Sequence, residues 1–101
     1  MTPENFKFLM EEEERAALER RLEIASRDTG QSRRVANFLL AWWNASECGG
    51  FDFTDLWNVD RSIAIDMATV FAMLTVCWHY PDSLGYRSQF EALVRDWRPR
   101  L

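Results

Sequence analysis

The sequence predicts an all-α fold, a single-domain array or bundle of about four helices. Four segments repeat apolar residues at helical spacing, and the joints between them are short and rich in Gly, Asp and Pro. The 101 residues fit one domain, with no internal repeat and no low-complexity tract. We expect residues 1–8 to form a flexible N-terminal segment and residues 9–101 to form the helical domain.

The first predicted helix covers about residues 9–26. Leu18, Leu22 and Ala25 recur at i, i+4 and i+7 and form one apolar side. The triplet Asp28-Thr29-Gly30 then ends this helix and starts the next.

The second predicted helix covers about residues 32–45 and ends before two consecutive glycines. Its apolar residues Val35, Phe38, Leu39 and Trp42 fall at i, i+3, i+4 and i+7.

The next segment, residues 51–59, is ambiguous. Phe51 and Phe53 alternate as in an extended chain. Alternatively, Thr54 caps a single helical turn that holds Leu56 and Trp57.

A third helix is predicted over about residues 61–79, with Asp60 as its N-cap, and we expect it to be the central helix. Apolar residues occupy two sides of it, and such a helix is either central or shared with another chain. One side holds Ile63, Met67, Val70, Phe71, Leu74 and Trp78. The other side holds Ile65, Ala72, Met73 and Val76.

The fourth predicted helix covers about residues 86–98. Phe90, Leu93, Val94 and Trp97 form its apolar stripe, and a proline follows at position 99.

Charge and the length of apolar runs limit the function classes. The formal net charge is −4, from 16 acidic and 12 basic residues. The longest stretch without charge before His79, residues 67–78, is well short of the about 20 residues that span a bilayer. The N-terminus lacks a signal-peptide pattern. The sequence therefore predicts a cytoplasmic protein in which Cys48 and Cys77 are reduced.

No motif in the sequence predicts a catalytic site. Asp28-Thr29-Gly30 matches the triplet of aspartic proteases, but that chemistry needs two carboxylates that share a proton. Here the triplet joins two predicted helices, where a capping role is expected. Cys48, Cys77 and His79 are the candidates for a metal site or a thiol–imidazole pair. The chain has only this one histidine, and side chains 77 and 79 point about 200° apart on a helix, so they cannot share an ion. We therefore predict no catalytic residue, no metal site, no cofactor and no enzymatic activity.

The aromatic and arginine content predicts an interaction module. The chain has five Trp, and Trp, Tyr and Arg concentrate at interface hot spots. We expect a non-enzymatic helical protein that binds another protein or a second copy of itself, as a homodimer. The predicted partner-binding residues are Trp43, Trp57, Arg33, Arg34, Met73 and Val76.

The alternative function is a nucleic-acid-associated factor in which an arginine cluster contacts phosphates. Its predicted binding residues are Arg20, Arg21, Arg33 and Arg34. The acidic net charge and the acids interleaved with these arginines favour internal ion pairs instead. A small enzyme is the third hypothesis.

Five stretches resemble a family of small, uncharacterised bacterial proteins, often encoded on proteobacterial integrative and conjugative elements. They are Asp28–Asn44, Gly49–Asp52, Asp55–Trp57, Tyr80–Asp82 and Leu84–Tyr86. The resemblance covers about residues 16–99. It implies a bacterial cytoplasmic setting and an accessory role on mobile DNA. Because the family has no assigned activity, the resemblance transfers no functional residue.

Overall fold

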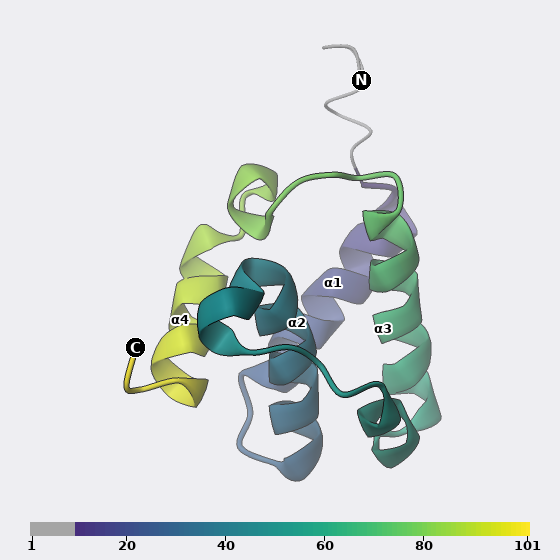
Figure 1. The fold of residues 1–101 in the computed structure, drawn as a ribbon. Coiled ribbons are helices and arrows are strands. Elements are labelled where there is room, and N and C mark those ends of the chain that lie inside the picture. Colours follow the sequence, from purple (N-terminus) through teal and green to yellow (C-terminus); the bar gives the residue numbers. More distant parts are fainter. Residues whose placement is uncertain (1–9) are drawn as a thin grey trace.

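The computed structural model describes residues 10–101, and all regular structure in this range is helical (Figure 1). This confirms the predicted all-α class. The prediction for residues 1–8 lies outside the described range. The elements are α1 (Glu12–Ala25), α2 (Gly30–Cys48), the 3₁₀ helix η2 (Phe53–Asn58), α3 (Arg61–Leu74), the 3₁₀ helix η3 (Pro81–Leu84) and α4 (Arg87–Trp97).

Capping residues explain where the first two helices begin. Glu11 and Glu14 form a reciprocal capping box at the start of α1, which therefore begins later than predicted. Thr29 caps α2, because its hydroxyl accepts a hydrogen bond from the backbone N–H of Ser32 at 3.0 Å. The predicted break between the two helices is confirmed, and its Asp-Thr-Gly triplet serves as helix punctuation.

Helix α1 occupies the middle of the packing order. It packs against α2 and against α3, whereas direct contacts between α2 and α3 are sparse, and α4 packs against α2. Figure 1 accordingly shows α3 and α4 on opposite sides of the molecule. The central position predicted for the third helix is therefore wrong. The core between the helices includes the fully buried side chains of Leu18, Val35, Leu39, Leu40, Met67, Val70, Met73 and Phe90.

The third helix is also shorter than predicted, because it ends at Leu74 rather than near His79. Local hydrogen bonds satisfy its last carbonyl groups: the Thr75 hydroxyl donates to Ala72 O at 2.7 Å, and the indole N–H of Trp78 donates to Thr75 O at 3.0 Å. Trp78 consequently leaves the predicted apolar stripe and is exposed.

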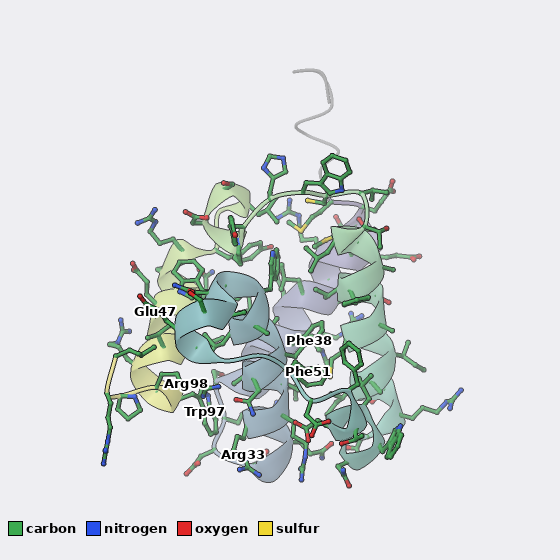
Figure 2. All side chains as sticks on the ribbon, viewed as in Figure 1. Arg33, Phe38, Glu47, Phe51, Trp97 and Arg98 are labelled. Carbon is green, nitrogen blue, oxygen red and sulfur yellow. The ribbon has the colours of Figure 1, made fainter. Side chains whose placement is uncertain are left out.

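The C-terminal end of α4 is hydrogen-bonded to α1 and α2. The indole N–H of Trp97 donates to Ala25 O at 2.9 Å, at the end of α1. The Arg98 guanidinium donates to Cys48 O at 2.9 Å and to Asn37 Oδ1 at 2.6 Å, both on α2 (Figure 2). These bonds connect positions that are more than 45 residues apart in the sequence.

Phe90 joins α4 to α2 through two neighbouring tryptophans. Its ring centroid lies 5.7 Å from Trp42, edge to face, and 5.6 Å from Trp43, stacked. Two adjacent residues on one helix therefore share a single aromatic neighbour. Such pairs add to the stability that burial itself provides.

We expect Phe90→Ala to lower the free energy of unfolding by about 3–5 kcal/mol, because the substitution leaves a cavity beneath two tryptophans. Urea denaturation followed by circular dichroism measures this change. The control is Phe53→Ala at an exposed position, where we expect a change within about 0.5 kcal/mol. Similar losses for the two variants would contradict the core role of Phe90.

Candidate functional site

An apolar groove lies between α2, η2 and α3, and it follows from the packing order. Both α2 and α3 rest on α1 without packing closely on each other. The α2–α3 connection, residues 49–60, crosses α2 and leads through η2 to the start of α3 (Figure 1). It begins at Gly49, whose φ of +93° favours glycine and lets the chain turn away from α2.

The fold of this connection resolves the ambiguity in residues 51–59. Within this segment Phe53–Asn58 form the 3₁₀ helix η2, and Asp52 rather than Thr54 is its cap. The Asp52 carboxylate accepts hydrogen bonds from the backbone N–H of Thr54 at 2.9 Å and from the Thr54 hydroxyl at 2.8 Å. Phe51 and Phe53 lie on either side of this cap in the sequence.

The groove has a volume of about 610 Å³, and all the residues that line it are apolar. Phe38 on α2 lies beside Phe51, with ring centroids 5.3 Å apart (Figure 2), and Phe51 lies 6.4 Å from Phe53. The lining residues are Phe38, Ala41, Trp42, Phe51, Phe53, Leu56, Met67, Ala68, Phe71, Ala72 and Leu74.

Two of the lining phenylalanines remain largely in solvent. Phe53 is 70% exposed and Phe71 is 56% exposed. Single exposed apolar residues are common on proteins, but a contiguous apolar depression with exposed aromatic residues is typical of a binding surface. The groove is thus the strongest candidate site in the described part of the chain.

Charges at the groove lie on the connection and not on α3. The connection carries Asp52, Asp55 and Asp60 and no basic residue. Hydrogen bonds from Thr54 hold the pKa of the exposed Asp52 carboxylate below its ordinary value. On α3, by contrast, residues 67–74 carry no charge.

Two of the predicted partner-binding residues lie near the groove. Trp57 is 81% exposed and belongs to η2, next to the lining residue Leu56. Arg34 on α2 reaches η2, where its Nε lies 3.7 Å from Asp55 Oδ1. Arg33 is exposed on α2.

The other predicted partner-binding residues are placed differently. Met73 is fully buried, so the prediction that it faces a partner is wrong. The packing of α3 on α1 buries Met73 together with Ile63, Met67 and Val70 and leaves Phe71 outside, so the core side combines residues from both predicted sides. Val76 is exposed, but it lies beyond the end of α3.

Trp43, the remaining predicted anchor, is partly buried. It stacks on Phe90 and lines a second cavity of about 570 Å³ together with Trp42, Asn44 and Tyr80. Asn44 has non-helical torsion angles, and its side chain accepts from the N–H of Glu47 at 3.2 Å. Asn44 therefore caps the last turn of α2 and bounds this cavity.

Sequence analysis missed Phe53 and Phe71 as site residues. Phe71 shares a helical arc with buried residues, so its spacing alone placed it in the core. The useful signal is the absence of charge on the side of α3 that carries Ala68, Phe71 and Ala72. A solvent-facing helix side usually carries polar residues.

Three of the four arginines in the predicted nucleic-acid cluster are paired within the chain. Arg20 donates to both carboxylate oxygens of Asp66 at 2.7 and 3.0 Å, and Arg21 lies 2.9 Å from the same carboxylate. Arg27 pairs with Glu23 at 2.7 Å. Arg21 is only 4% exposed, so its prediction as a phosphate contact is wrong. These ion pairs disfavour the nucleic-acid hypothesis.

Both cysteines belong to the core. Both Cys48 and Cys77 are buried free thiols, and burial raises the pKa of each. Within residues 10–101, no three His, Cys, Asp or Glu side chains are grouped so that they could hold a metal ion. Over the same range, every helix is too short or too polar to cross a bilayer.

Residues 15–98 match the model of a family of unknown function (DUF7673). The chain belongs to this family. The match runs from residue 15, within α1, to the end of α4 and therefore includes the whole groove. No curated protein and no solved structure matches the chain.

The Asp66 ion pairs generate a prediction about stability. We expect Asp66→Asn to lower the free energy of unfolding by about 3 kcal/mol, because it leaves the Arg21 charge buried without its carboxylate. Urea titration at pH 7 measures this loss. Asp96→Asn, at an exposed position on α4, is the control and is expected to have little effect.

The same pairs predict a dependence on pH. The hydrogen bond from Arg20, assisted by the charge of Arg21, holds the pKa of Asp66 below its ordinary value of 3.8. The stabilisation by this carboxylate is therefore present above the unfolded-state pKa and is lost as the pH falls through the lower, folded-state pKa. We expect stability to fall more steeply below about pH 4 in the parent protein than in Asp66→Asn. Equal losses of the free energy of unfolding with falling pH in the parent protein and in Asp66→Asn would contradict this.

Proposed function

We propose that this protein is a non-enzymatic interaction module that binds a segment of another protein in the groove between α2, η2 and α3. The observation that carries the proposal is the open, entirely apolar lining of the groove, with Phe53 and Phe71 exposed beside it. Burial of apolar surface is the dominant favourable term in most protein associations.

The chemistry of the lining supports a polypeptide ligand over a small polar one. Sites for substrates and polar ligands combine apolar walls with a few convergent polar groups. Here no lining residue is ionisable. The indole N–H of Trp42, the one polar group on a lining side chain, already donates to His79 O at 3.0 Å. Recognition in this groove therefore relies on shape and apolar contact.

The biological setting that we propose combines this module with the family resemblance. It is the cytoplasm of a bacterium, where the protein assists a larger machinery encoded with mobile DNA. The binding of a separate protein is the central element of this proposal. Self-association through the same groove is the competing proposal. Crosslinking distinguishes a different protein from a second copy of the chain as the bound partner.

Site-specific photo-crosslinking tests the proposal in cells of the native host. A benzophenone amino acid at position 53 is expected to form an adduct with a different polypeptide, because this position lies on the groove. The matched control carries the same group at position 78, which is also exposed but lies on the connection between α3 and η3. Mass spectrometry identifies the adducts from both positions.

A second substitution shows whether the adduct depends on the groove. Phe71→Asp introduces a charge into the opposite wall, and we expect it to reduce the adduct at position 53 at least about 10-fold, as expected for an interface anchor. Circular dichroism verifies that the variant is folded. Identical adducts from positions 53 and 78, or an adduct that joins two copies of the chain, would contradict the proposal.

A further inference from the structure

We infer that the partner segment is a basic amphipathic helix, with an apolar stripe along one side and Lys or Arg residues beside it. This inference rests on the proposed function and specifies its partner. The two observations behind it are the helical walls of the groove and the acidic connection at its edge. Each is independent of the other.

The shape of the groove suits a helix. Its two long walls, α2 and α3, are helices that already rest on α1, so an added helix continues the same kind of packing. Ala41, Ala68 and Ala72 line the groove, and small residues let another helix approach closely. Larger side chains of the incoming helix then fit over these alanines, next to Phe53 and Phe71. Recognition of an amphipathic helix in an apolar groove is a recurrent binding mode.

The charge at the edge favours a basic helix. Asp52 lies in sequence between two lining residues, Phe51 and Phe53, and is exposed. Its carboxylate accepts from Thr54, and that of Asp60 accepts from Gln31 at 3.3 Å. Arg34 offsets the charge of Asp55 across 3.7 Å. Asp52, the exposed carboxylate that flanks the lining, is therefore expected to attract Lys or Arg and to repel carboxylates.

A second copy of this chain fits the same surface less well. A two-fold interface uses the same patch on both subunits, so each acidic connection would approach an identical groove with no basic lining residue. The chain has a net charge of −4. Its helical arginines at positions 20, 21 and 27 are already paired with Asp66 and Glu23. The acidic edge and the acidic net charge therefore favour a different polypeptide over a second copy.

The experiment compares synthetic helical peptides of about 18 residues, long enough to retain some helicity in water. Two peptides share one leucine stripe and carry either Lys or Glu beside it, and a third has the Lys composition in scrambled order. Fluorescence anisotropy measures binding to the full chain in 50 mM and 500 mM NaCl. We expect the Lys peptide to bind about 10-fold more tightly than the Glu peptide at low salt, and the difference to shrink at high salt.

Variants of the chain locate the effect. Asp52→Asn is expected to weaken binding of the Lys peptide about 3-fold at low salt, while Asp96→Asn on α4 leaves it unchanged. Phe71→Asp is expected to abolish binding of the leucine-stripe peptides. Phe53→Ser provides a second test of the groove if Phe71→Asp does not fold. The scrambled peptide is expected not to bind.

The outcomes separate this inference from the proposed function. Equal affinity for the Lys and Glu peptides, lost in Phe71→Asp, overturns the basic partner but supports a protein-binding groove. Binding that neither groove variant weakens overturns both. If neither stripe peptide binds, the inferred partner is wrong. A homodimer in analytical ultracentrifugation that Phe71→Asp dissociates assigns the groove to a second copy and overturns both proposals.

Discussion

The structure depends on the packing of α2 and α3 against two sides of α1. This arrangement leaves α3 in contact with one major helix, so a large part of its apolar surface faces outward. The Asp66 carboxylate strengthens the α1–α3 contact by pairing with two arginines of α1. Because α2 and α3 are held apart by a common neighbour, the space between them becomes the groove.

The connection between α2 and α3 determines the character of this groove. It covers part of the gap with Phe51, which packs on Phe38, and it presents Phe53 to solvent. The same segment contributes the acidic side chains at the edge. One short element therefore provides both exposed apolar surface and exposed carboxylates beside the groove, and we propose that the first contacts a partner and the second discriminates between partners. A protein that uses this surface gains affinity from the aromatic residues and selectivity from the carboxylates.

Ion pairs inside the molecule change the role of the arginine cluster from a predicted phosphate-binding site to a structural one. In sequence, the arginines at positions 20, 21, 33 and 34 form a basic region that suits phosphate contacts. In the folded chain, the carboxylates of Asp66 and Asp55 come from distant segments and pair with three of them. Arg21 in particular becomes a buried structural residue. The positive potential that a nucleic acid would encounter is reduced accordingly.

The sequence by itself determined the helices, because helical periodicity and capping are local. The break at Asp28-Thr29-Gly30 and the stripe that contains Phe90 follow from residues within a few positions of one another. The end of α3 was the main local error, since the hydrogen bonds of Thr75 and Trp78 stop it earlier than its apolar pattern indicates.

Only the tertiary structure decided which apolar residues became core and which became surface. Met73 and Phe71 belong to the same apolar helix, and contact with α1 buries the first and leaves the second exposed. The position of the groove was undetermined for the same reason. It requires three segments to meet, and the sequence pattern of each segment describes its own faces but not the neighbour that will cover them.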